Sequence, residues 1–306
     1  MTKPLPTPHA DKLQALLGNR NLPDADKPRV GEAVDRYNHW IEEIKQVKGE
    51  GDGLVEPLVD SLNRYRKWLD LDLIFDSSEN FLHRQRGQLK LDNSVLEEFL
   101  PWLVKRRFAD QTADTGLSLG PTNAFSQLSF DSDPLNRTNG GGMTIRSKDH
   151  DFAVALPLFL KASHSEDFRD SRQARTNLAY FAVEIKTNLD KTMFQEASAT
   201  AYDLKLALPS SKYFLLCEWL DMTPISTAVT AIEEVVVLRK AKRLSANIRG
   251  NFASARGRAE NRVTFERHLD DHPFALDAFR RFLWHLDQLL SSGSGDEQQA
   301  LERGWF

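Results

Sequence analysis

Residues 180–186 read Tyr-Phe-Ala-Val-Glu-Ile-Lys, a short apolar run that ends in an acid, a hydrophobe and a lysine. The run predicts a buried strand, whose successive side chains point to opposite faces. Glu184 and Lys186 are therefore expected on one face. The other face is expected to carry Phe181, Val183 and Ile185. A carboxylate and an ammonium group at a strand end can hold a divalent metal and orient a water, as metal-dependent phosphodiester hydrolysis requires.

The stretch 145–154 offers the second acid that such a metal site needs. It reads Ile-Arg-Ser-Lys-Asp-His-Asp-Phe-Ala-Val, so Asp151 adjoins an apolar strand and Asp149 lies two positions before it. We choose Asp151 because the strand fixes its position more tightly, and Asp149 stays open as the alternative. The backbone carbonyl of Ile185 is placed to add a further oxygen, and oxygen is the ligand that Mg²⁺ prefers. The predicted metal ligands are Asp151, Glu184 and Ile185.

The predicted catalytic residues are Asp151, Glu184 and Lys186. The metal would polarise a phosphate oxygen and lower the pKa of a bound water. Lys186 would contact that water or the scissile phosphate and stabilise the developing negative charge. A Glu-x-Lys pair taken by itself is more often a surface salt bridge. Here the pair ends a buried strand, has an acid before the upstream strand and precedes a helix, which favours the catalytic interpretation.

The composition is that of an ordinary globular protein, with 306 residues, 41% hydrophobic and 27% charged. One cysteine, Cys217, excludes an internal disulfide and a cysteine zinc cluster, and its apolar surroundings predict a buried thiol. No N-terminal apolar run resembles a signal peptide, and no 18-residue apolar stretch could span a membrane. We therefore expect a cytoplasmic protein with no membrane partner.

A local basic tract stands out in a chain whose net charge is −4. Residues 239–262 hold eight Lys and Arg against one acid, Glu260. Such a tract indicates a directed binding face for nucleic acid, and a solvated surface is the alternative. The basic residues are Arg239, Lys240, Lys242, Arg243, Arg249, Arg256, Arg258 and Arg262.

Residues 1–110 are predicted to form a helical region, because apolar residues recur at helical spacing in 30–47, 54–73 and 94–103. Asn93 and Ser94 are expected to cap the third of these helices. Residues 111–290 are predicted to form a catalytic domain, and 291–306 a flexible tail rich in Ser and Gly.

The predicted catalytic domain alternates strands with one long helix. Strands are expected at 125–130, at 143–146 and 152–160 (two strands, or one bent strand), at 180–186, 213–219 and 235–238. The polar stretch 163–177 is expected as an exposed loop or short helix. A helix over 190–207 would connect two neighbouring strands, and another is expected over 274–290. The fold class is therefore α/β with a mixed sheet.

The start of the helix after the Glu-x-Lys strand leaves several roles open. Thr192 and Gln195 fit a capping box, although Gln195 could also face the site. Glu196 is either a metal or water ligand or a favourable acid in the first helical turn. Lys191 is a candidate phosphate contact.

The pattern of an acid on one strand and Glu-x-Lys on the next resembles the PD-(D/E)xK nuclease superfamily. Three longer runs resemble the Bpu-type (Bpu-ten-I-like) type II restriction endonucleases over about residues 115–245. They are Val-Glu-Ile-Lys-Thr-Asn-Leu-Asp-Lys-Thr-Met-Phe-Gln-Glu-Ala at 183–197, Leu-Leu-Cys-Glu-Trp-Leu-Asp-Met-Thr-Pro at 215–224 and Gly-Pro-Thr-Asn-Ala-Phe-Ser at 120–126. No proline precedes Asp151, so that acid is assigned by position and not by motif.

The resemblance implies Mg²⁺-dependent cleavage of double-stranded DNA by a PD-(D/E)xK core, with a second like or unlike nuclease subunit as a conceivable partner. A DNA repair or recombination nuclease and a non-cleaving DNA-binding protein are the alternatives. DNA contact requires cations for phosphates and polar side chains for base edges. The expected DNA-binding residues are Asn123, Lys191, Arg239, Lys240, Lys242, Arg243, Arg249 and Arg256.

Overall fold

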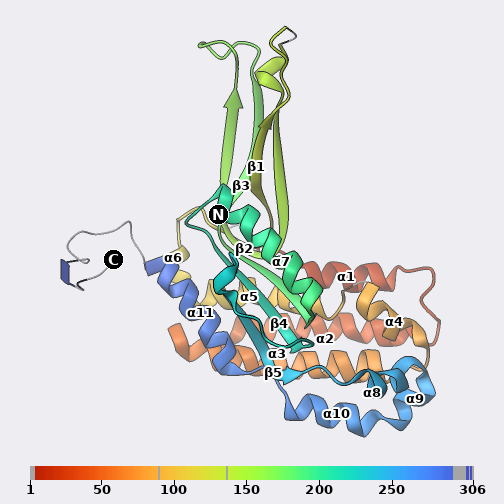
Figure 1. Cartoon of the computed structure of the whole chain (residues 1–306). Helices are drawn as coiled ribbons and strands as arrows, with labels where there is room; N and C mark the ends of the chain where they lie inside the picture. Colours follow the sequence, from red (N-terminus) through yellow and green to blue (C-terminus); the bar gives the residue numbers. More distant parts are fainter. Residues whose placement is uncertain (1–3, 89, 136, 292–300, 303, 305–306) are drawn as a thin grey trace.

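A mixed five-stranded sheet forms the centre of the computed structural model, which describes residues 4–88, 90–135, 137–291, 301–302 and 304 (Figure 1). The strands lie side by side in chain order, β1-β2-β3-β4-β5. The first three pair antiparallel, and β3, β4 and β5 pair parallel. Their bounds are β1 (Ser118–Phe130), β2 (Met143–Ala162), β3 (Arg172–Leu189), β4 (Lys212–Leu220) and β5 (Glu234–Lys242).

Helices cover both faces of the sheet, most of them from the N-terminal region. This region contains α1 (Pro8–Leu17), α2 (Lys27–Gln46), α3 (Val55–Trp68), α4 (Asn80–Gln88), α5 (Asn93–Arg107) and the short α6 (Ala109–Thr112). A π-helical segment, η2 (Leu69–Phe75), continues α3. The later helices are α7 (Lys191–Ala207), α8 (Ala246–Gly250), α9 (Ala255–Glu260), α10 (Arg262–Asp271) and α11 (Leu276–Ser291).

The alternation of β3 sorts its side chains between two hydrophobic clusters. Phe181, Val183 and Ile185 belong to the larger cluster, together with residues of the N-terminal helices and α11. Ala182, the neighbour of Glu184 on the other face, belongs to the second cluster with α7. The predicted separation of faces is confirmed, and the sheet lies between the N-terminal helices with α11 on one side and α7 on the other (Figure 1).

The predicted strands are all present but longer than their apolar runs indicate. Residues 143–162 form one strand, the bent alternative. The predicted loop or helix over 163–177 is wrong for residues 172–177. These residues form the start of β3, which pairs antiparallel with the end of β2, beginning with Arg172 opposite Ala162. Backbone pairing, and not hydrophobicity, sets this strand end. Cys217 is a buried free thiol in β4, as expected, and burial raises its pKa to about 12.

Two helix starts differ from the predictions. α7 begins one residue after Asp190, whose carboxylate accepts a 2.9 Å hydrogen bond from the Met193 backbone N–H, so the Thr192–Gln195 capping box is wrong. At α5 the cap is Asp92, which accepts a bond from Asn93 N, and not Asn93 or Ser94. In each case an aspartate one or two positions earlier supplies the acceptor.

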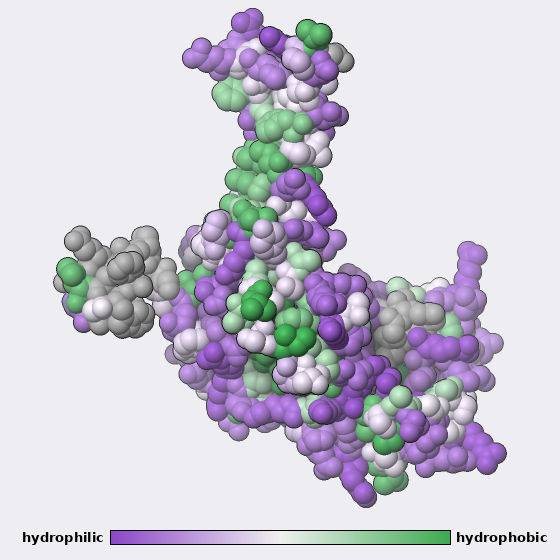
Figure 2. Space-filling model, viewed as in Figure 1, coloured by the Kyte–Doolittle hydropathy of each residue, from purple (hydrophilic) through white to green (hydrophobic). Residues whose placement is uncertain are grey.

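β1, β2 and β3 extend beyond the helices as a long arm (Figure 1). The turn between β1 and β2 meets the turn between β2 and β3 at the tip, where the Gly140 N–H donates to the Asp170 carbonyl at 3.0 Å. Both ends of β2 therefore lie at the tip, and the middle of β2 lies at the base. Figure 2 shows hydrophobic side chains along the shaft. Large apolar residues exposed on the arm include Leu128, Phe130, Phe159 and Phe168.

A buried ionic cluster joins the N-terminal helices to the sheet. Arg66 of α3 contacts Glu218 of β4 at 2.6 Å and Asp70 of η2 at 3.3 Å. Arg239 of β5 contacts the same two acids at 3.2 and 3.7 Å. All four side chains are at most 4% exposed. The cluster and the shared hydrophobic core place the helical region and the sheet in one packed unit.

The predicted flexible tail lies largely outside the described residues, since only 301–302 and 304 are described beyond Ser291. Across the described ranges, none of the helices combines the length and the apolar composition needed to cross a lipid bilayer.

Candidate active site

Asp151 lies at an irregularity of β2. Gly120 of β1 pairs with Ala153 of β2, and the next pair is Thr122 with His150. Two steps along β1 therefore correspond to three steps along β2. The extra residue in β2 makes a β-bulge, a device that redirects side chains beside active sites. Pairing of β2 with β3 ends here, and the Asp151 carboxylate accepts a 2.7 Å hydrogen bond from the Ile185 backbone N–H. The bulge thus fixes Asp151 against the Glu-x-Lys segment.

A close backbone approach accompanies the bulge. Gly120 has φ +127°, and a Cβ on it would lie 2.5 Å from the Cγ of Pro6. Only glycine fits this combination of positive φ and crowding. The glycine in the 120–126 motif therefore allows β1 to pack closely against Pro6 while it pairs with β2, the strand that carries Asp151.

Glu184 and Lys186 point to the same side of β3 and contact each other. The Lys186 Nζ lies 2.5 Å from Glu184 Oε1. The second carboxylate oxygen, Oε2, accepts a 2.6 Å hydrogen bond from the hydroxyl of Tyr213, on β4. Both side chains of the pair are a little over one-fifth exposed, so the cluster is accessible from one side. The structure therefore brings the three predicted catalytic residues together at the base of the arm.

The protonation equilibria of the two acids differ because their surroundings differ. Burial raises the pKa of Asp151, and the bond from Ile185 N–H only partly offsets this effect. Burial also acts on Glu184, but the hydrogen bonds from Lys186 and Tyr213 outweigh it and lower the pKa of Glu184. Burial and the Glu184 charge raise the pKa of Tyr213 well above its usual value, so the hydroxyl remains a donor.

Helix α5 brings a third carboxylate to the site that sequence reasoning missed. Glu97 is 8% exposed, and its pKa is raised by burial and by the charge of Asp151. Asn93, one turn earlier, links this acid to the strand, because its Nδ2 donates to Glu97 Oε1 at 3.0 Å and to the Ile185 carbonyl at 3.3 Å. Helical spacing places Asn93 and Glu97 on one face, but no sequence signal connects α5 to β3.

His150 and Tyr213 complete the surroundings of Glu184. His150 is 3% exposed, and neither ring nitrogen has a hydrogen-bond partner among the described residues. Burial lowers the pKa of His150 to about 4. Its ring packs edge-on against Tyr213, with centroids 6.0 Å apart. A neutral imidazole therefore forms one wall behind Glu184.

The donor set suits a magnesium ion. In the described part of the chain, no three His, Cys, Asp or Glu side chains converge closely enough to bind a metal by themselves. Mg²⁺ does not require this, because it commonly takes one or two carboxylates and keeps waters and substrate oxygens as its other ligands. The charge of Glu184 contributes to the raised pKa of Asp151, and a divalent cation would offset that repulsion. Asp151, Glu184 and the Ile185 carbonyl therefore fit this ion.

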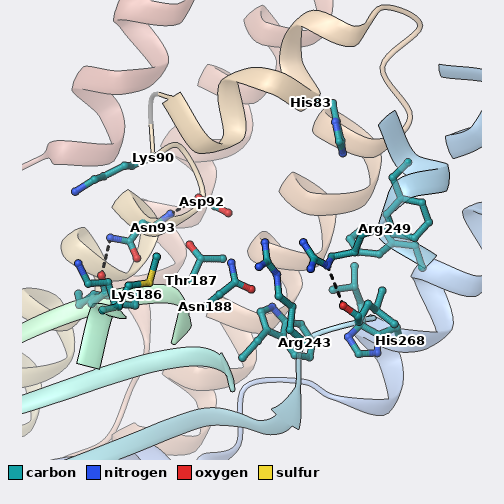
Figure 3. A pocket seen from close by; sticks show the side chains of 17 residues that line it. His83, Lys90, Asp92, Asn93, Lys186, Thr187, Asn188, Arg243, Arg249 and His268 are labelled. Carbon is teal, nitrogen blue, oxygen red and sulfur yellow. Dashed lines mark hydrogen bonds between the residues drawn. The ribbon is translucent and has the colours of Figure 1, made fainter. Parts of the chain in front are cut away.

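A cavity of about 490 Å³ adjoins the site at Lys186 (Figure 3). Residues 185–188 of β3 form one wall, and residues from the segment after β5 form the opposite wall. Four cationic side chains contribute to its lining, namely Lys90, Lys186, Arg243 and Arg249. Two arginines of the basic tract, Arg243 and Arg249, thus line the same cavity as Lys186.

The rest of the basic tract divides between structural and surface roles. Arg239, 4% exposed, belongs to the buried ionic cluster, and Arg258, 1% exposed, donates to the backbone carbonyls of Phe75, Ser77 and Glu79. Neither guanidinium has surface for a phosphate, so the expectation for Arg239 is not supported. Burial of a cation is tolerated only with partners of this kind.

Three further residues of the expected DNA-binding set are exposed and lie outside the cavity lining. Lys240 pairs with Asp277 at 2.5 Å and Arg256 with Glu260 at 2.7 Å. Lys242, at the end of β5, is exposed as well. The tract therefore forms no single cationic face.

The remaining candidates lie at the edges of the site. Asn123 donates to Asp149 across β1 and β2 at 2.8 Å, and both residues are exposed. Lys191, Gln195 and Glu196 are exposed on α7. Asp149, the alternative metal ligand, thus has an amide partner at the surface and no bond to the Glu-x-Lys segment.

Comparison with known proteins agrees with this geometry. Residues 88–306 match the family described as Bpu10I restriction endonuclease. The solved structure described as "native BbvCI A2B2 tetramer at low resolution" is similar in fold, with a TM-score of 0.53 and 18% identity over 86% of this chain and 96% of that chain. No curated protein matches the chain. The resemblance found in the sequence and the mixed-sheet α/β nuclease fold are both confirmed.

Proposed function

Because this chain belongs to the Bpu10I restriction endonuclease family, we propose that it is a type II enzyme that hydrolyses double-stranded DNA at a specific sequence with Mg²⁺. Membership of the family implies an endonuclease. The observation that carries the proposal is the convergence of Asp151, Glu184 and Lys186, fixed by the bulge in β2 and by the bond from Ile185 N–H to Asp151.

In this proposal Asp151, Glu184 and the Ile185 carbonyl hold the magnesium ion. The ion supplies Lewis acidity toward a phosphate oxygen and a bound water of lowered pKa. Asn93 positions the Ile185 carbonyl through its 3.3 Å bond, and Tyr213 positions Glu184 through its 2.6 Å bond. Such outer partners orient ligands and raise metal affinity.

Lys186 acts on the DNA and not on the metal. Its ammonium group contacts Glu184 and also lines the cavity, so it can donate to a phosphate oxygen at the boundary between the two. A positioned cation at this place stabilises the charge that develops on the phosphate during the reaction. The cavity's other cations, Lys90, Arg243 and Arg249, would hold the adjacent DNA backbone.

We also propose a second nuclease subunit, like or unlike this chain, as a partner. The similar BbvCI structure, which is described as an A2B2 tetramer, supports this part of the proposal. Size-exclusion chromatography with light scattering, with and without DNA, measures the assembly. A mass of one chain under every condition of active cleavage would contradict it.

Digestion of supercoiled plasmid with and without Mg²⁺ tests the enzyme function. Discrete fragments that require Mg²⁺ and disappear with a chelator are expected. Glu184→Ala should abolish cutting and leave DNA binding largely intact, because it removes a metal ligand and no phosphate contact. A smear of products would indicate a nonspecific nuclease, and a mobility shift without cutting a binding protein.

A further inference from the structure

The cavity beside Lys186 has a size that suits one nucleotide. Its volume of about 490 Å³ falls in the range of roughly 300–1,000 Å³ typical of pockets for single small ligands. A DNA duplex, whose major groove alone is about 12 Å wide, cannot enter such a space. A nucleotide that has left the duplex can, and enzymes that act on DNA do accommodate nucleotides rotated out of the stack.

Two arginines in the lining of the cavity, Arg243 and Arg249, suit an anion. The Arg249 Nε donates to the Leu244 carbonyl at 2.9 Å, which fixes the side chain (Figure 3). No described carboxylate forms an ion pair with Arg249, so its Nη groups are available to a ligand. Arg243 is held by Asp221 through one Nη at 2.9 Å. The fork of an arginine matches the oxygens of a phosphate group.

The lining of the cavity also includes apolar and aromatic residues. Among them are Phe252, Phe265 and Leu269, each 4–5% exposed. A site for the DNA backbone alone has no need of such a floor, because phosphate and sugar are polar. A base, with its flat and largely apolar faces, fits this surface.

His268 provides a flat ring within this lining. It stacks on Trp219 with centroids 4.5 Å apart and planes inclined by 22°. The Arg239 guanidinium also lies over the Trp219 ring, 4.9 Å from its centroid. His268 is half-buried, and burial, His272 and Arg239 lower its pKa to about 4, so at neutral pH the ring is uncharged. Its remaining surface can stack with a base and its nitrogens can meet base edges.

We propose that this cavity receives one nucleotide of the DNA substrate, rotated out of the duplex, with its phosphate against Arg243 and Arg249 and its base against His268 and the apolar floor. The inference rests on the proposed function, because it takes DNA to be the substrate. Lys186 lines both the cavity and the catalytic cluster, so the extruded nucleotide lies next to the strand that is cut.

Ligand-observed NMR and calorimetry on the full chain test the pocket without any cleavage. The probes are the four deoxynucleoside monophosphates, the matching deoxynucleosides and inorganic phosphate. The monophosphates should bind at least tenfold more tightly than either part, with saturation transfer to the base protons. Equal competition by inorganic phosphate, or no transfer to the base, would overturn the proposal in favour of a simple anion site.

Two variants and a matched control assign the binding to this cavity. Arg249→Gln should weaken monophosphate binding at least tenfold. Arg256→Gln, in an exposed arginine of the same tract outside the cavity, should leave it unchanged. His268→Asn should reduce the preference for monophosphate over phosphate, and it serves as the second variant if Arg249→Gln does not fold. Unchanged monophosphate affinity and base preference in folded cavity variants would overturn the assignment.

Extrusion itself is tested on a duplex that carries the mapped cleavage site. With Ca²⁺ in place of Mg²⁺, 2-aminopurine at the extruded position should brighten several-fold on binding, and Arg249→Gln should remove the increase. No brightening at any position of the site would overturn extrusion. Cutting without monophosphate binding removes the cavity inference alone, whereas monophosphate binding without any cutting removes the proposed function and leaves a nucleotide pocket of another purpose.

Discussion

At the scale of single residues, the site depends on which aspartate the bulge selects. Asp151 and Asp149 lie two positions apart in β2, but only Asp151 bonds to the Glu-x-Lys segment. Asp149 bonds to Asn123 at the surface. The two residues therefore form a natural matched pair for mutation.

Asp151→Asn should lower the rate of plasmid cleavage by about a thousandfold, because several kcal/mol of metal-derived stabilisation are lost and ~4 kcal/mol corresponds to that factor. Asp149→Asn should cut within a few-fold of the unmodified chain. Both changes keep size and remove charge, so folding should survive. Normal cutting by Asp151→Asn together with an inactive Asp149→Asn would reverse the assignment.

Tyr213→Phe isolates the hydroxyl that holds Glu184 Oε2. We expect the Mg²⁺ concentration for half-maximal cleavage to rise by roughly 10–100-fold, the usual effect of losing an outer-shell partner. The maximal rate at saturating Mg²⁺ should largely recover, since Glu184 itself remains. A lower maximal rate with an unchanged Mg²⁺ requirement would contradict this positioning role.

At the scale of elements, the strand that carries Glu184 and Lys186 could be predicted from the sequence because its evidence is local. Period-two alternation fixes which side chains of β3 share a face, and Glu184 and Lys186 follow from that. The bulge at Asp151 depends on pairing with β1, and Tyr213 approaches Glu184 only because β4 lies next to β3. Glu97 comes from a helix in the N-terminal region. These contacts are long-range, and no local pattern encodes them.

The basic tract illustrates the same limit. Charge density alone cannot separate an arginine with buried acidic partners from one that lines a cavity. Arg239 has Glu218 and Asp70 as partners, which lie 21 and 169 positions away in the chain. The segment from β5 to α8 thus mixes a structural arginine with the two candidates for phosphate contact, Arg243 and Arg249.

The salt dependence of DNA binding distinguishes these roles. The slope of log affinity against log salt is negative, and each lost phosphate contact should reduce its magnitude by roughly 0.9 for duplex DNA. Arg243→Gln with Arg249→Gln removes the one phosphate contact that both arginines are proposed to share, so it should reduce the magnitude of the slope by about 0.9. Arg256→Gln is the control. It changes an arginine of the same tract that lies outside the cavity, so the slope should stay unchanged. An unchanged slope in the double variant would place the DNA backbone elsewhere.

At the scale of the whole molecule, the helices and the sheet share one core. Residues of α2, α3, α5, β3, β4 and α11 belong to a single hydrophobic cluster. The ionic cluster of Arg66, Asp70, Glu218 and Arg239 lies within the same interface. Stability of the sheet therefore depends on residues far from the site.

Arg239→Ala should lower the free energy of unfolding by roughly 3–5 kcal/mol, because removing one partner leaves buried acids without compensation. Urea denaturation followed by far-UV circular dichroism measures the loss. Lys242→Ala, an exposed residue three positions later, should change the free energy by less than about 0.5 kcal/mol. Comparable stabilities of the two variants would show that the cluster contributes little.

Buried histidines should make stability fall as the pH drops. Burial, with Arg66 nearby, lowers the pKa of His9 to about 3, whereas the unfolded chain binds a proton near pH 6.5. As the pH falls, the unfolded state therefore binds protons before the folded state does. His9 alone should lower the free energy of unfolding by about 1 kcal/mol between pH 7 and pH 5.5. His150 and His268, each with a pKa lowered to about 4, act in the same direction.

Urea midpoints measured from pH 7.5 to pH 5 test this dependence. His9→Gln should be less stable at neutral pH, because His9 bonds to Ser94 and Tyr65, but its midpoint should vary less with pH. A midpoint that falls equally steeply in both proteins would exclude His9 as a source of the effect.

The ionic cluster also limits how this chain can change by descent. Arg66 and Glu218 are 152 positions apart, so a recombination event between the helical and the sheet segments separates partners that must match. A hybrid gene that takes its first half from one lineage and its second half from another inherits buried charges without their counterparts. Substitutions at these positions should therefore be fixed together, and the two segments should be inherited as one block. Laboratory shuffling should therefore fail at crossovers between Asp70 and Glu218, those within the arm included, and should succeed at crossovers that follow Arg239.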